Sequence, residues 1–403
     1  MKPRTLLALL AALAFVVKLY CAATTFGTAD VTLFWEFGRM IHSRGLVGMY
    51  QATELFNHTP LIGWFSEGAY LLANWIGDGT AFNFLLRLPA IVADLVATAA
   101  LIWLREKTGR PSYWAIGLFA VSPVSFMVSG FHGNVDSLMV MGLVLAAVAC
   151  AVERPVWSGL FLGLSCNIKV VPLFLIPAFF FFWWHRKAAL RFSIPAAATV
   201  LIGWSVPLLF VPGIFIKNVI GYSSYWGFWG ITYGLRLTGI PSLQEVGFTD
   251  QTMPQRVIIM ILKAIVVCSV LYVAWRRRGT EPMGIFQTLA LSWGIFFVFA
   301  PGFGAQYLVW LAPFFLVAAE AWYAALTIAS SVALIIYYTA SCDGKIPWNV
   351  ALNSQRGGIV AMPWLVSAWL VLAVFLLRQM QVFIPLAGRK VTDQDALEVV
   401  PEG

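Results

Sequence analysis

Two acidic residues, Asp30 and Glu36, lie in the segment GTADVTLFWEFG, directly after the first long apolar run of the chain. Only 11% of all residues are charged, so two carboxylates together at this point suggest chemistry. A general base must lie close to the hydroxyl group whose proton it removes. Six residues separate the two carboxylates, so on one helix they face different ways. We expect Asp30 to be the base, whereas Glu36 contacts substrate or belongs to a solvated helix face.

A second polar group occupies the short segment SGFHGNVDS between two apolar runs. It contains His132, Asn134 and Asp136, and the glycines Gly130 and Gly133 permit a tight turn. Such side chains can hold a divalent cation or hydrogen-bond a sugar. One carboxylate with a histidine and an asparagine has no diagnostic metal spacing. The alternative for Asp136 is that it caps the following helix.

Basic residues inside apolar segments are candidates for phosphate binding. Lys169, in GLSCNIKVVPL, is the strongest, because its ammonium group is a point charge with mobile donors. The alternative is a lysine that extends toward the lipid surface. Arg87 and Asp94 are seven residues apart and share one helix face. We expect a structural role for Asp94, which needs a partner in lipid, and the role of Arg87 stays open.

Further polar groups lie in the segment APGFGAQYLVW and in the loop 212–255. Gln306 and Tyr307 follow a break that contains proline and glycine, and Arg236 lies within the loop. We expect all three on the same side of the protein as Asp30, where they are candidates for substrate binding. A simple turn explains Gln306 and Tyr307 equally well.

The composition indicates what kind of protein positions these residues. The chain is 60% hydrophobic, whereas soluble domains are roughly 45–50% apolar. Only helices and closed barrels satisfy their backbone in lipid, and continuous apolar runs lack the alternation of a barrel. The sequence thus predicts an all-α polytopic membrane protein. The clear spans are about 5–22, 84–104, 113–129, 136–152, 193–211, 256–274, 284–300, 305–320, 322–339 and 361–378.

Two other apolar segments are ambiguous, and the distribution of lysine and arginine decides both. Segment 61–77 is short and contains Glu67, so we expect an interfacial helix within a long external loop, 23–83. Segment 156–184 is too long for one span and is interrupted by polar residues and prolines around Lys169. We expect two short helices that meet there. Each would measure about 22 Å, less than the roughly 30 Å of hydrocarbon, which indicates an internal cavity entered from outside.

The resulting topology has about twelve spans, with both termini in the cytoplasm. Residues 1–388 would form a single transmembrane domain with external loops 23–83 and 212–255, and residues 389–403 a disordered cytoplasmic tail. The short loops favour a bacterial inner membrane, with the polar groups on the periplasmic face. In a eukaryotic reticulum membrane the same loops would face the lumen.

The order of these motifs resembles the GT-C superfamily of membrane glycosyltransferases, which includes PIG-M-like mannosyltransferases and dolichol-dependent transferases. The resemblance covers roughly residues 5–320. It rests on the acidic residue of the first external loop, followed in order by GLVGMYQATELFNHTPL, RLPAIVAD, SGFHGNVDS, NIKVVPL and PGFGAQY. We expect all of these motifs on one side of the membrane.

The resemblance implies an inverting glycosyltransferase. It would move a hexose or pentose, with mannose favoured, from a polyprenyl-phosphate donor to a lipid or glycan acceptor. Asp30 would be the base, and Asp136 a second catalytic acid that orients the acceptor or a metal ion. Lys169, Arg87 and the turn at Gln306 would surround the donor phosphate.

The chain departs from the superfamily pattern at one position. Many members carry a paired Asp-x-Asp motif, and Thr28 stands where the first of those acids would be. This difference leaves the need for Mg²⁺ or Mn²⁺ open, and no cofactor is certain. Membrane lipids surround such a protein, and nothing in the sequence indicates a nucleic-acid partner.

A secondary transporter or a flippase for lipid-linked or small sugars is the main alternative. Many spans, broken helices and buried charges are also features of transporters. A polymerase or ligase for lipid-linked polysaccharide would share the substrate class without a base at Asp30. Transporters usually show corresponding breaks in two halves, and here the breaks are not paired. We therefore favour the transferase.

Overall fold

The structure, a computed structural model, describes residues 2–222, 225–244, 251–342 and 354–383. Within these residues the protein is all-α, as the sequence predicts. The predicted tail, 389–403, lies outside the described residues.

The helices follow one another without a separate soluble unit among the described residues. The α-helices are α1 (Pro3–Thr24), α2 (Ala29–Ala52), α3 (Pro60–Ile76), α4 (Gly79–Thr108), α5 (Tyr113–Ala120), α6 (Pro123–Ser125), α7 (Asp136–Ala151), α8 (Pro155–Ile168), α9 (Ile176–His185), α10 (Ala189–Phe210), α11 (Pro212–Phe215), α12 (Gly230–Arg236), α13 (Pro241–Gln244), α14 (Met253–Arg276), α15 (Gly284–Phe299), α16 (Ala312–Ala318), α17 (Glu320–Ser341) and α18 (Ser354–Phe383). The π-helices are η1 (Phe126–His132) and η3 (Ile216–Ile220), and the 3₁₀-helices are η2 (Val171–Leu175) and η4 (Ala305–Val309).

Seven helical stretches of the described chain are long and apolar enough to cross a membrane. They are α1, α4, Tyr113–His132, α10, α14, α17 and Arg356–Met380 within α18. Shorter apolar helices of 10–17 residues occupy the positions of the other predicted spans. These are Asp136–Ala151, Pro155–Ile168, Val171–His185, Gly284–Phe299 and Ala305–Ala318. The protein is therefore a multi-pass membrane protein, and it reaches the predicted number of spans only if the shorter helices also cross.

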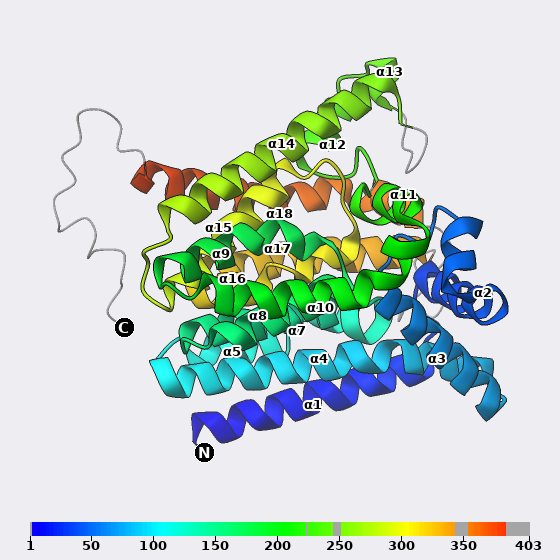
Figure 1. Cartoon of the computed structure of the whole chain (residues 1–403), viewed down its shortest axis with the longest axis horizontal. Helices are drawn as coiled ribbons and strands as arrows, with labels where there is room; N and C mark the ends of the chain where they lie inside the picture. Colours follow the sequence, from blue (N-terminus) through cyan, green and yellow to red (C-terminus); the bar gives the residue numbers. More distant parts are fainter. Residues whose placement is uncertain (1, 223–224, 245–250, 343–353, 384–403) are drawn as a thin grey trace.

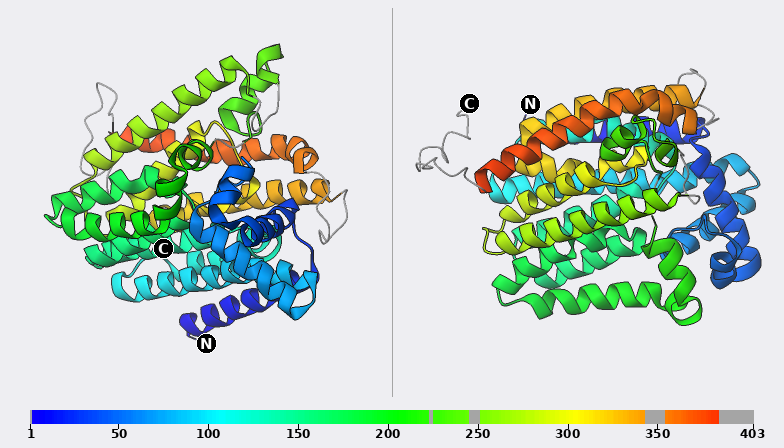
Figure 2. Two further views of the ribbon diagram at one scale, coloured as in Figure 1. Left: turned by 45° about the vertical axis from the view of Figure 1, so that its right-hand side comes forward. Right: turned by 90° about the horizontal axis from the view of Figure 1, so that it is seen from above.

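The long helices run side by side as a bundle, with α2 and α3 together at one end of it (Figure 1). The start of α1 and the end of α18 lie at the opposite end, which the view from above in Figure 2 also shows. An ion pair between Lys217 of η3 and Glu54, just after α2, links the α11–η3 connection to the α2 end of the bundle (2.6 Å). One end of the bundle is thus built from loop helices that do not extend along it.

The predicted break of segment 156–184 is present. Helix α8 ends at Ile168, and Lys169 has an extended backbone with φ −140° and ψ 152°. The 3₁₀-helix η2 follows with Pro172 in its first turn, and α9 begins with Pro177 in the same position. Proline has no backbone N–H to donate and is tolerated in a first turn, so the sequence itself ends one helix and starts the next.

The stretch before α7 is also irregular, and this irregularity places His132. Pro123 separates α5 from the short α6, and the chain then forms the π-helix η1 from Phe126 to His132. Gly133 ends it with φ +85°, a conformation that favours glycine. A Cβ on Gly133 would lie 2.4 Å from the side chain of Val31 in α2, so the two segments touch there.

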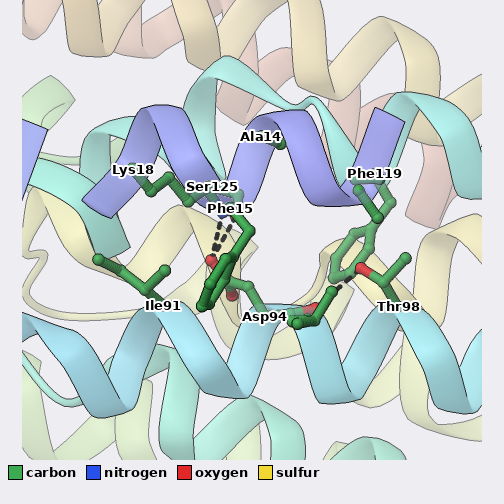
Figure 3. Close-up of a pocket in the computed structure, with 11 residues that line it drawn as sticks. Ala14, Phe15, Lys18, Ile91, Asp94, Thr98, Phe119 and Ser125 are labelled. Carbon is green, nitrogen blue, oxygen red and sulfur yellow. Dashed lines mark hydrogen bonds and ion pairs between the residues drawn. The ribbon is translucent and has the colours of Figure 1, made fainter. Parts of the chain in front are cut away.

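The predicted structural role of Asp94 has a specific partner. Lys18 of α1 donates to the Asp94 carboxylate of α4 (2.6 Å), and Ser125 bonds both groups at 2.7 Å. Figure 3 shows the three side chains beside a small pocket that has room for about one water molecule. This buried ion pair joins α1 and α4 to the residue that directly precedes η1.

We predict that Lys18→Met lowers the free energy of unfolding by about 3 kcal/mol, because it leaves Asp94 as an unpaired charge inside the bundle. The melting temperature of the purified protein in detergent measures this loss. The double substitution Lys18→Met with Asp94→Leu removes both charges and should recover most of the stability. A single variant that melts like the wild type would contradict the interpretation.

Candidate active site

Three residues that the sequence singled out meet at the start of α2. The Asp30 Oδ2 atom accepts a hydrogen bond from Asn134 Nδ2 (2.6 Å) and lies 3.1 Å from His132 Nε2. His132 and Asn134 are buried, whereas the Asp30 side chain is 30% exposed. The Oδ1 atom of Asp30 has no hydrogen-bond partner among the described residues. The carboxylate is therefore held by one oxygen and open at the other.

The other side of His132 is held as well. Its Nδ1 atom lies 2.7 Å from the hydroxyl group of Tyr338 in α17. Both contacts are satisfied when Nε2 carries the proton and donates to Asp30 while Nδ1 accepts from Tyr338. Burial raises the pKa of Asp30, but its contacts with His132 and Asn134 and the charge of Lys169 outweigh burial. The pKa of Asp30 therefore lies below its ordinary value, and the group is a carboxylate at neutral pH.

A second group of residues surrounds the helix break. Lys169 Nζ donates to Asp136 Oδ1 (2.8 Å), and Trp310 Nε1 donates to the same oxygen (2.5 Å). The rings of Tyr307 and Trp310 stack with centroids 3.9 Å apart, and Lys169 Nζ lies 5.6 and 5.5 Å from them. These distances permit cation–π attraction. The lysine thus has one carboxylate partner and two aromatic neighbours.

Asp136 is completely buried, and its Oδ2 atom has no hydrogen-bond partner among the described residues. It is the first residue of α7, where the helix dipole favours a negative charge. The N-cap position belongs to Val135 and no side-chain cap bond forms, so the alternative of Asp136 as a helix cap is wrong.

Together these residues form one polar cluster near the α2 end of the bundle. The charge of Lys169 acts on both Asp30 and His58, and Asp30 also acts on His58. The polar cluster comprises Asp30, His58, His132, Asn134, Asp136, Lys169, Tyr307, Trp310 and Tyr338.

Arg87 lies directly behind this cluster. Its guanidinium group is completely buried and donates to the backbone carbonyls of Ala22 in the last turn of α1 and of Thr25 just after it. It also donates to the carbonyls of Gly130 and Phe131 in η1. Arg87 therefore connects the chain between α1 and α2 to the π-helix η1, which ends at His132. The Thr28 hydroxyl closes the same junction by donating to the His132 carbonyl (2.6 Å). This geometry supports a positioning role for Arg87 and not direct contact with substrate.

The remaining predicted residues lie in different surroundings. Glu36 pairs with Arg39 on an exposed face of α2 (2.6 Å), as the solvated-face alternative describes. Arg236 lies over the ring of Phe228, 5.9 Å from its centroid. Gln306 is half-buried beside Tyr307. None of the contacts described for Glu36 or Arg236 is with a member of the polar cluster, and their role in substrate binding stays a prediction.

Three members of the cluster were not singled out from the sequence. Trp310 follows Tyr307 by three residues, a spacing that could have marked it, since both lie in the segment APGFGAQYLVW. His58 is one of only four histidines in the chain, which was a usable signal. Nothing in the sequence distinguishes Tyr338 from the other tyrosines.

The described part of the chain contains no group of three or more histidine, cysteine, aspartate and glutamate side chains that could hold a metal ion. Asp30 and Asp136, the two acids of the cluster, are bonded to separate partners. Lys169 is the cation that directly contacts an acid of the cluster.

Comparison with known proteins gives two matches. The model of glycosyltransferase family 87 matches residues 79–301, which is more than half of the chain and includes His132, Asp136 and Lys169. GPI mannosyltransferase 1 of Kluyveromyces lactis is 21% identical over 280 residues. That similarity covers 65% of this chain and 65% of the yeast protein, so it spans about two thirds of each.

We predict that Arg87→Lys lowers the melting temperature in the absence of any substrate. A lysine has no planar fork of donors, so several buried carbonyl groups lose their partner, at a cost of about 2 kcal/mol or more. Arg39→Lys, in the exposed pair with Glu36, is the matched control and should melt like the wild type. A stable Arg87→Lys variant with weakened substrate binding would instead place Arg87 in contact with substrate.

Proposed function

The chain belongs to glycosyltransferase family 87, and from this premise we propose that it transfers mannose from a polyprenyl-phosphate donor to a lipid or glycan acceptor, with inversion at the anomeric carbon. Family membership makes the protein an enzyme, so the transporter alternative does not hold. The observation that carries the proposal is the polar cluster, in which a half-open carboxylate and a lysine at a helix break act on each other.

The acceptor side of the reaction belongs to Asp30. Its Oδ2 atom is held by Asn134 and His132, which leaves Oδ1 to receive a proton from the acceptor hydroxyl group. The acceptor oxygen forms a bond to the anomeric carbon, and the bond from that carbon to the phosphate oxygen breaks. The bonding electrons leave with the phosphate. A single base is enough for such an inverting displacement, because the leaving group needs no proton.

The donor side belongs to Lys169. An ammonium group has three donors, and Asp136 uses one of them, so others are left for a phosphate oxygen. Negative charge grows on the leaving phosphate in the transition state, where a fixed cation stabilises it most. Asp136 is buried behind the lysine and positions it rather than meeting the acceptor. The stacked rings of Tyr307 and Trp310 limit the directions in which Lys169 can move.

The proposal also assigns the site to one face of the membrane. The proposal places the α2 end of the bundle on the periplasmic or external face of the inner membrane and both termini in the cytoplasm. The start of α1 and the end of α18 both lie at the opposite end of the bundle, which supports this placement (Figure 1). The shorter helices would complete the spans, and the short pair α8 and α9 would let a lipid phosphate approach Lys169. The match to a mannosyltransferase supports mannose as the sugar.

We predict that Asp30→Asn reduces sugar transfer by about 100-fold or more, because the amide cannot accept the proton. The wild type and the Asp30→Asn variant, each in nanodiscs, would be given a panel of radiolabelled polyprenyl-phosphate sugars. The assay would measure labelled product and free lipid phosphate for both proteins. Glu54→Gln, which removes an exposed carboxylate from its pair with Lys217, is the matched control and should retain activity. Full turnover by Asp30→Asn would remove the base from the proposal.

We predict that Lys169→Gln raises the KM for the lipid-phosphate donor by about 10- to 100-fold, the value of a charge-assisted hydrogen bond. The control is Lys217→Gln, which removes an exposed lysine from its pair with Glu54. Asp136→Asn should have a similar effect, and the double variant should be no worse than Lys169→Gln alone, since Asp136 acts through the lysine. Additive losses would show that Asp136 has a separate role.

A further inference from the structure

His58 lies in the connection between α2 and α3, and its backbone is fixed from two sides. The hydroxyl group of Tyr50 donates to the His58 carbonyl (2.8 Å). The next residue, Thr59, is completely buried and donates its hydroxyl group to the carbonyl of Asn167. Asn167 precedes Lys169 by two residues at the end of α8. The connection is therefore bonded to the same helix end that positions Lys169.

The imidazole ring is held by aromatic contacts. Its centroid lies 5.0 Å from that of Phe34, 5.9 Å from Phe56 and 6.1 Å from Phe37. Phe34 follows Asp30 by four residues, so the two lie on one face of α2. The ring is half-buried and lies within electrostatic reach of both Lys169 and Asp30. The aromatic contacts thus fix the ring within electrostatic reach of the two charged groups of the polar cluster.

Neither ring nitrogen of His58 has a hydrogen-bond partner among the residues that the structure describes. Burial, with a smaller contribution from the charge of Lys169, lowers the pKa of His58 to about 3. The ring is therefore neutral at physiological pH. A neutral imidazole has one donor and one acceptor, which suits a hydroxyl group, itself both donor and acceptor.

We propose that His58 is a substrate-contacting residue that hydrogen-bonds a hydroxyl group of the transferred sugar. The inference rests on the proposed function, in which the acceptor lies at Asp30 and the donor phosphate at Lys169. The sugar ring is joined to the phosphate and attacked by the acceptor, so it must lie between these two residues. His58 acts electrostatically with both of them, and its ring nitrogens have no hydrogen-bond partner in the described part of the chain.

The test uses full-length protein in nanodiscs and radiolabelled polyprenyl-phosphate mannose. His58→Phe keeps the aromatic packing and removes both polar atoms, whereas His58→Gln returns a donor and an acceptor. We expect His58→Phe to melt like the wild type and to lose about tenfold in kcat/KM, and His58→Gln to recover part of the loss. His42→Phe, an exposed histidine on α2, is the matched control and should be fully active.

Donors that lack single hydroxyl groups identify the contact. The wild type should lose about tenfold in kcat/KM with one deoxymannose donor, and His58→Phe should show no further loss with that donor. A His58→Phe variant with wild-type kcat/KM, or one that loses only thermal stability, would overturn the inference and leave the proposed function intact. Wild-type protein that turns over no mannose donor would overturn the proposed function itself, and the inference with it.

Discussion

A charge inside an apolar bundle is stable only with a partner, and Asp136 and Lys169 meet this constraint for each other. Their ion pair joins the first turn of α7 to the break between α8 and η2. Trp310 adds a third element by donating to the same carboxylate oxygen. The broken helix can therefore leave a lysine at this depth without exposing its charge to lipid. The candidate site is built around this pair.

The proposed base, Asp30, has a different kind of support. Asp30 lies at the start of a helix that packs at the end of the bundle, and its orientation depends on where the preceding chain leaves α1. Arg87 fixes that point through backbone carbonyls, and the Thr28 hydroxyl repeats the connection. Lys18 and Asp94 then join α1 and α4 to the chain before η1. Two buried cations outside the cluster thus set its geometry. Arg87 acts by hydrogen bonds to backbone carbonyls, and Lys18 acts by its ion pair with Asp94.

The proposed function assigns separate chemical tasks to the two charged groups of the cluster. The carboxylate of Asp30 and the ammonium group of Lys169 have opposite charges. Asp30 accepts from Asn134 with one oxygen and keeps the other for substrate, and Lys169 donates once to Asp136 and keeps its other donors for substrate. Aromatic rings pack around Lys169 and His58, so these groups gain direction from contacts that are not hydrogen bonds. Such preorganisation is effective because it costs no rearrangement during the reaction.

The sequence by itself determined the features that depend on neighbouring residues. Apolar runs defined the helices, and the prolines after Lys169 defined the break, because proline acts on its own turn. The rarity of carboxylates marked Asp30 and Asp136. Only the tertiary structure decided which distant groups meet: His132 lies 102 residues from Asp30 and Tyr338 lies 206 from His132. Helix packing sets such contacts, and no local pattern encodes them, so the pairing of Asp94 and the place of Arg87 behind the site followed from the fold alone.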